Sequence, residues 1–125
     1  MKDFIRTGGF NSPPSSANVA ALGTATLIST RVPDGTSLLI TEFYHYVSDI
    51  GAWLVAKWKI KINGVELPAW ASIQNFMGDA SNPYKLDEPI LVRGGDLLEV
   101  TAYNADPAIT YGIGVGLKGF YGRKR

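Results

Sequence analysis

Residues 53–64 read WLVAKWKIKING, and this stretch decides the fold class. Every second residue from Leu54 to Ile62 is apolar. The positions between the later ones hold Lys57, Lys59 and Lys61. Successive side chains of a β-strand point to opposite faces, so this period of two is typical of a strand with one buried face. Asn63-Gly64 then predicts a two-residue hairpin turn, because both residues tolerate positive φ.

Outward from this strand, the chain shows about eight β-like runs separated by turn-forming residues. They cover residues 22–30, 37–48, 53–63, 65–70, 71–77, 85–92, 97–104 and 109–121. No segment of ten or more residues carries a helical stripe. We therefore expect an all-β domain built as a two-sheet jelly roll, with a simpler Greek-key β-sandwich as the alternative. Pro89 predicts that its strand is an edge strand or contains a bulge.

The apolar faces of these strands predict the core. Because the side chains of a strand alternate between its two faces, the apolar side chains of each strand should lie between the two sheets. We expect burial of Leu54, Trp58, Ile60, Ile62, Leu98, Val100, Ile113 and Val115.

The last strand alternates in a different way, because glycine occupies every second position of one face. These positions are Gly112, Gly114 and Gly116. Glycine inside a strand costs about 0.5–1 kcal/mol relative to alanine, so the row indicates that something packs closely against that face. A neighbouring sheet or aromatic ring of the same domain is one explanation, and Phe43, Tyr44 and Tyr46 could supply it. A contact with another subunit is the other.

Residues 1–20 differ from residues 21–125, which we assign to the sandwich domain. They show neither a helix nor a strand period, and Pro13 and Pro14 favour extended geometry. One interpretation is a disordered terminus. The other is an extended arm with Phe10 as its anchor, which makes few contacts within its own domain and orders against another chain.

Composition narrows the function classes. A chain of 125 residues fits one domain, and the absence of cysteine excludes disulfides, thiolate chemistry and Cys-ligated zinc. A net charge of +1 argues against a dedicated nucleic-acid binder. No apolar run reaches the ~20 residues of a membrane span, and residues 1–6 do not resemble a signal peptide. We expect neither a membrane partner nor secretion by the general route.

The sequence offers no catalytic constellation. His45 is the only histidine, and a lone histidine in a strand is more often a packed or surface residue than a base. No Gly-x-Ser-x-Gly elbow is present. Asp87 and Glu88 are neighbours that point to opposite faces of a strand, and the loop around Asp79 has too few carboxylates for calcium. We therefore predict a protein that is not an enzyme and has no cofactor and no metal site.

Two basic features and two tryptophans remain as candidates for binding. The lysine row is typical of a solvated strand face, whereas the tail Arg123-Lys124-Arg125 could touch nucleic acid or an acidic neighbour. Trp53 and Trp70 could stack on sugar rings or anchor a protein interface.

This layout resembles the small jelly-roll decoration (cement) and minor capsid proteins of tailed bacteriophages. Segments that look like viral sandwich domains are Lys61-Ile62-Asn63-Gly64-Val65-Glu66-Leu67-Pro68 and Leu91-Val92-Arg93-Gly94-Gly95-Asp96-Leu97-Leu98-Glu99-Val100. The resemblance implies a homo-oligomer, most simply a trimer, that is made in the host cytoplasm and stabilises the virion by binding the major capsid protein or another virion protein.

The expected contact residues are then Phe10, Pro13, Pro14, the three alternating glycines and the basic tail Arg123-Lys124-Arg125. The alternative function is a carbohydrate-binding, lectin-like module used in host attachment, with Trp53 and Trp70 as its sugar-stacking residues.

Overall fold

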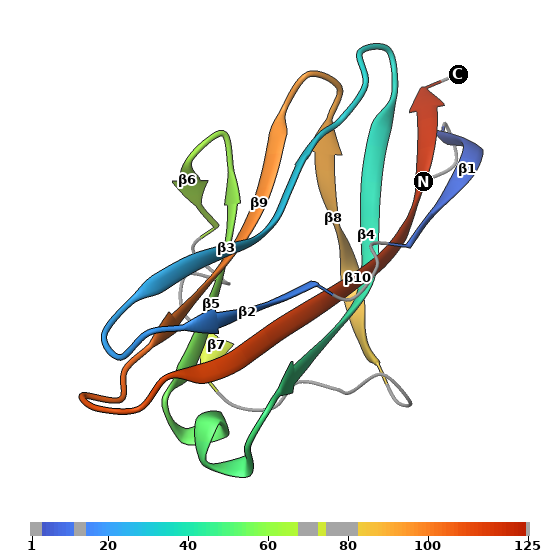
Figure 1. The fold of residues 1–125 in the computed structure, drawn as a ribbon. Coiled ribbons are helices and arrows are strands. Elements are labelled where there is room, and N and C mark those ends of the chain that lie inside the picture. Colours follow the sequence, from blue (N-terminus) through green and yellow to red (C-terminus); the bar gives the residue numbers. More distant parts are fainter. Residues whose placement is uncertain (1–3, 12–14, 68–72, 75–82, 125) are drawn as a thin grey trace.

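The computed structural model describes residues 4–11, 15–67, 73–74 and 83–124, which form ten strands and one short 3-10 helix joined by turns and loops (Figure 1). The strands are β1 (Phe4–Asn11), β2 (Ser15–Val19), β3 (Thr24–Arg31), β4 (Ser37–Val47), β5 (Ala56–Ile62), β6 (Val65–Glu66), β7 (Ile73–Gln74), β8 (Tyr84–Arg93), β9 (Leu97–Asn104) and β10 (Tyr111–Lys124). The 3-10 helix is η1 (Ile50–Leu54).

The strands form two antiparallel sheets that pack face to face, so the predicted all-β sandwich is confirmed. The first sheet has the order β1-β10-β4-β8, with β2 also paired to β10, and the second has the order β3-β9-β5-β6, with β7 also paired to β5. β1 and β2 both pair with β10 at the same edge of the first sheet, and β6 and β7 both pair with β5 at the same edge of the second. If each of these two pairs is counted as one position, the sandwich has eight strand positions. When these eight positions are numbered from 1 to 8 in chain order, the first sheet has the order 1-8-3-6 and the second the order 2-7-4-5. This arrangement is the two-sheet jelly roll.

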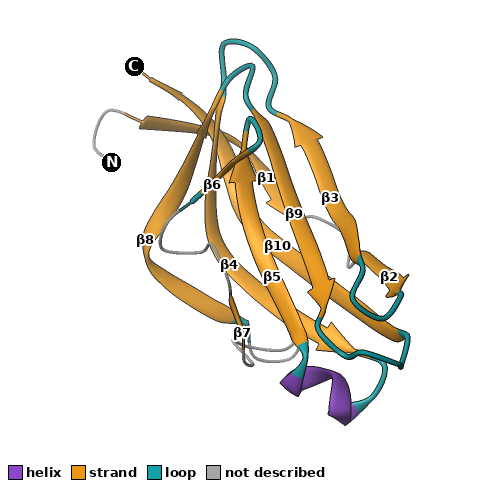
Figure 2. Ribbon diagram, turned by 90° about the vertical axis from the view of Figure 1, so that its left-hand side faces the viewer, coloured by secondary structure: helices purple, strands orange, loops and turns teal. Residues whose placement is uncertain are grey.

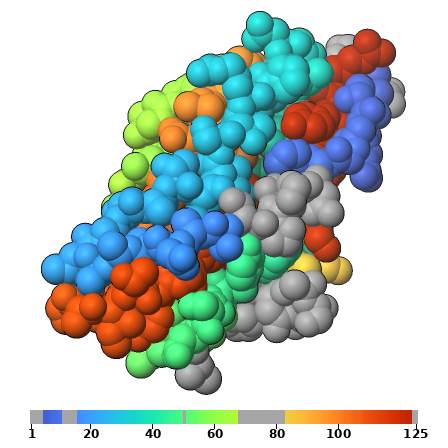
Figure 3. All heavy atoms as spheres, in the orientation of Figure 1, coloured from blue at the N-terminus to red at the C-terminus, as the bar shows by residue number. Residues whose placement is uncertain are grey.

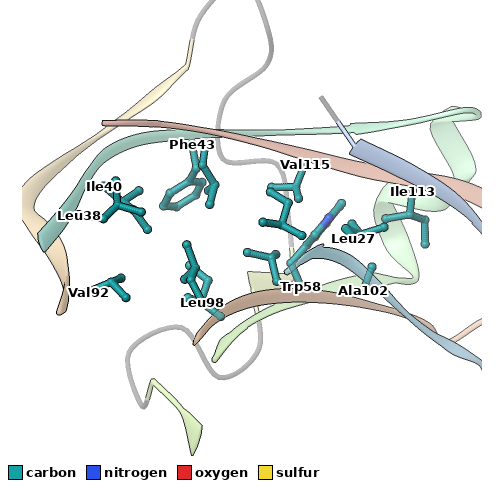
Figure 4. Close-up of a cluster of buried hydrophobic side chains, with 14 of the residues drawn as sticks. Leu27, Leu38, Ile40, Phe43, Trp58, Val92, Leu98, Ala102, Ile113 and Val115 are labelled. Atoms are coloured by element: carbon teal, nitrogen blue, oxygen red, sulfur yellow. The ribbon is translucent and has the colours of Figure 1, made fainter. Parts of the chain in front are cut away.

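The core fills the space between the sheets (Figure 4). Trp58, Ile60, Leu98, Val100, Ile113 and Val115 are buried as predicted, and Ile62 is partly buried against them. Leu54 is an exception, because its side chain is 78% exposed. The alternating pattern continues up to Leu54, but the backbone there belongs to η1, whose first turn is closed by the Asp49 side chain accepting from the Gly51 amide.

The prediction that residues 1–20 make few contacts within their own domain was wrong for the parts that the structure describes. β1 pairs with the final residues of β10, from Phe4 opposite Lys124 to Asn11 opposite Lys118. β2 pairs with the first residues of the same strand. The two segments therefore belong to the sandwich rather than to an arm free of it. A sheet edge offers unpaired amides and carbonyls to any extended segment, whatever its side-chain period, which is why the sequence did not indicate this pairing.

The turn between β5 and β6 has the conformation that the sequence predicted. Asn63 and Gly64 have φ values of 53° and 79°, as the predicted hairpin turn between β5 and β6 requires. The Asn63 side chain also accepts from the Leu97 amide at 2.9 Å and donates to Asp96 Oδ1 at 3.0 Å, so it ties this turn to the start of β9. β8, which contains Pro89, is the edge strand of its sheet, and its register with β4 shifts between Ile40 and Glu42.

Candidate functional site

The glycine row of β10 lies beneath side chains of the neighbouring strand β4. Gly114 is directly opposite Tyr46 and Gly116 directly opposite Tyr44. A Cβ atom at Gly114 would come within 2.6 Å of Tyr46 Oη, and one at Gly116 within 2.6 Å of Tyr44 Cε1. The glycines therefore let two tyrosine rings lie flat on the outer face of the sheet. This is the aromatic-ring explanation within one domain, and it accounts for Gly114 and Gly116 without a second subunit.

The two tyrosines form a small aromatic layer over these glycines. Their ring centroids are 6.5 Å apart with an interplanar angle of 30°, and Tyr44 is only 5% exposed. Burial raises the pKa of the Tyr46 phenol above its usual value, so this hydroxyl stays protonated at neutral pH.

Of the other residues predicted at an interface, Phe10 packs within its own domain. Its ring meets the edge of Tyr121 at a centroid distance of 5.6 Å, and it lies against the core. Arg123 is exposed at the end of β10, opposite Ile5, while Lys124 pairs through its backbone with Phe4. Pro13, Pro14 and Arg125 lie outside the described residues.

Trp53 and Trp58 are arranged for packing. Trp53 in η1 is half-buried, and its ring centroid lies 6.0 Å from that of Trp58. Trp58 in turn stacks on His45 at 4.2 Å and donates from Nε1 to the Gly114 carbonyl at 3.2 Å. Trp53 therefore contributes to the core edge rather than standing over an open groove. Trp70 lies outside the described residues.

His45 is a packed residue, which is one of the two roles that the sequence favoured. It is 1% exposed between the rings of Phe43 and Trp58. Burial lowers its pKa to about 4, so the imidazole is neutral at pH 7. Among the described residues its Nδ1 has no hydrogen-bond partner.

A groove that the sequence did not predict lies on the outer face of the second sheet, the sheet nearer the viewer in Figure 2. It measures about 570 Å³. Its lining consists of the lysine row of β5, together with Thr24, Glu66, Thr101 and Tyr103 from the neighbouring strands. The sequence showed the lysines but not the strand beside them, because the pairing of β5 with β9 joins residues about forty positions apart.

A second surface gathers at the end of the sandwich where β2 turns into β3, η1 follows β4, and β9 turns into β10. Leu22, Leu54 and Ile109 are 59%, 78% and 50% exposed there. Figures 1 and 3 show the three connections side by side at the lower end of the molecule. Backbone hydrogen bonds join them, from the Leu22 amide to the Asp106 carbonyl and from the Ala105 amide to the Val55 carbonyl. We call this surface the loop end.

Leu22 has an unusual backbone within the loop end. Its φ is 57°, in the left-handed region where glycine or asparagine is the ordinary choice. A leucine in this conformation costs about 1 kcal/mol or more. Its side chain is mostly exposed, so burial within the described part of the chain does not compensate this cost.

Within the residues that the structure describes, no three histidine or carboxylate side chains gather as metal ligands would. No helix in that part of the chain has the length and apolar character of a membrane span. Comparison with known proteins adds no family: no protein-family model matches the chain, and no curated protein matches it either.

Proposed function

We propose that this chain is a non-enzymatic structural protein of a virus particle, of the decoration type, that self-associates through its loop end and stabilises the particle surface. The jelly-roll strand order supports the proposal, because this architecture recurs in viral capsid proteins. The same order also occurs in lectins, so the fold alone does not choose between the two.

The observation that carries the proposal is Leu22. A strained backbone that is retained with an exposed apolar side chain has a physical rationale when that side chain is buried in an assembly. Leu54 and Ile109 are further exposed apolar residues, on the two adjoining connections. Symmetry would repeat this contact between subunits, and a trimer would present several copies of its surface to a capsid.

Immunogold labelling of intact particles tests the virion assignment. An antibody against this chain should label the outside of particles produced from the genome that encodes it. Particles that lack the chain should lose their contents at a lower temperature. A chain that stays in the host lysate and never sediments with particles would contradict the proposal.

Variants test the role of the loop end. Leu54→Asn should lower the association constant by about tenfold or more, since losing one buried leucine contact costs about 1.5–3 kcal/mol. Val65→Asn is the matched control, because Val65 is 69% exposed at the start of β6, beside the hairpin turn at the opposite end of the sandwich. Equal association of the two variants in sedimentation velocity would remove the loop end from the proposal.

The carbohydrate-binding module is the second candidate. Its support does not come from Trp53, which packs beside Trp58, but from the groove on the second sheet.

A further inference from the structure

We propose that the groove on the outer face of the second sheet is a binding site for an acidic oligosaccharide, one whose sugar units carry carboxylates. The site is independent of the loop end, so it would bind its ligand in a monomer as well as in an assembly.

The groove runs along β5, the strand that supplies the three lysines. Side chains on one face of a strand repeat about every 6.6 Å, so Lys57 and Lys61 lie about 13 Å apart along the strand, with Lys59 between them. On one side β9 contributes Thr101 and Tyr103, which pair in register with Lys59 and Lys57. This makes an elongated site with cations along one wall and hydroxyl groups along the other.

The charges of the site are only partly neutralised. Lys59 forms an ion pair with Glu66, with Nζ and Oε1 3.0 Å apart. It is the one ion pair that the structure shows within the described part of the chain, and it leaves the ammonium groups of Lys57 and Lys61 at the two ends of the row. Glu99, opposite Lys61 in register, is the other carboxylate of this face. An elongated ligand with carboxylates spaced along its length would therefore meet a cation near each end of the groove.

The remaining groups favour a sugar as the carrier of those charges. The hydroxyls of Thr24, Thr101 and Tyr103 can donate to or accept from the hydroxyls of pyranose rings, and the carboxylate of Glu66 can accept from them. The half-buried Tyr103 also offers a ring against which a sugar face can pack. A volume of about 570 Å³ is within the range of small-ligand sites, here sufficient for a few sugar units rather than a polymer surface.

A nucleic acid fits the same site less well. The affinity of a protein for nucleic acid depends on neutralising several closely spaced phosphates. This face carries three lysines, one of them ion-paired with Glu66, and two carboxylates in all. The net charge of +1 for the whole chain supplies no wider basic field around the groove.

Isothermal titration calorimetry on the full chain tests the proposal with hexamers of galacturonate, hyaluronan and sialic acid. At least one should bind in low salt, and a methyl-esterified galacturonate hexamer should bind at least tenfold more weakly than its free acid. Lys57→Gln combined with Lys61→Gln should weaken binding tenfold or more. Lys85→Gln, on the exposed edge strand of the other sheet, should leave it unchanged. Thermal melting checks that the variants keep the wild-type fold.

Tyr103→Ala gives a second, charge-neutral readout and should weaken binding at least fivefold. Absence of binding to all three hexamers would overturn the proposal. So would equal losses in the lysine double variant and Lys85→Gln, or a single-stranded DNA dodecamer that binds more tightly than every hexamer. Calorimetry measures binding of the oligosaccharide, whereas sedimentation velocity measures self-association of the chain. The two proposals can therefore fail independently.

Discussion

The cover of tyrosine rings over β10 gives the most specific prediction for stability. Replacing Gly116 with alanine puts a Cβ atom within 2.6 Å of Tyr44 Cε1, so the ring must move. Tyr44 is only 5% exposed, and lifting it returns buried surface to water. An aromatic side chain buries about 150–250 Å², so exposing half of it at about 25 cal/mol per Å² costs about 2–3 kcal/mol.

Alanine recovers part of this cost, because it is about 0.5–1 kcal/mol better than glycine within a strand. We therefore expect Gly116→Ala to lower the free energy of unfolding by about 2 kcal/mol, measured by urea denaturation. Gly114→Ala should cost less, since Tyr46 is more exposed and can tilt into solvent. Gly8→Ala is the control, because a Cβ atom there meets nothing within 4 Å.

A double-mutant cycle isolates the clash. In a Tyr44→Ala background the ring is gone, so Gly116→Ala should become neutral or stabilise the protein by about 0.5 kcal/mol. If Gly116→Ala costs the same in both backgrounds, or no more than Gly8→Ala in the wild type, the tyrosine ring is not the reason for glycine at this position.

Three further predictions concern the interior. Trp58→Ala should cost about 3–5 kcal/mol in the same urea assay, because it empties the centre of the core; an unchanged midpoint would reject the strand register. Asn104→Ala should cost about 2–3 kcal/mol, because it removes the amide that donates to the Val19 and Ile109 carbonyls; a loss below about 0.5 kcal/mol in the same urea assay would show that these carbonyls find other partners. Burial lowers the pKa of His45 in the folded protein to about 4, below its ordinary value of 6.5, so its contribution to stability is complete above pH 6.5 and is lost as pH falls towards 4. That loss amounts to about 3 kcal/mol, and His45→Phe should flatten this part of the urea-midpoint profile against pH; an unchanged slope would assign the pH dependence to other groups.

The local pattern of the sequence predicted the strands and the core well. The alternation in β5 and β10 and the turn at Asn63-Gly64 need only neighbouring residues, and the structure follows them. The predicted burial of Leu54 was wrong, because an alternation of apolar residues carries no information on whether the backbone is a strand or a 3-10 helix.

Features that depend on strand pairing could not be predicted in the same way. The tyrosines opposite the glycines of β10 come from β4, about seventy residues earlier in the chain. The groove likewise needs the register of β5 against β9. The pairing of β1 and β2 rests on main-chain hydrogen bonds, which leave no side-chain period to detect.

The molar mass of the protein in solution tests the central proposal most directly. Light scattering on the wild type at micromolar concentration should give about 40 kDa, three times the 13.5 kDa of one chain. Leu22→Asn should shift that mass towards the monomer while keeping or raising the unfolding free energy, because asparagine accepts the positive φ and removes the apolar side chain. A monomeric wild type, or a Leu22→Asn variant that is more stable yet equally trimeric, would contradict assembly through the loop end.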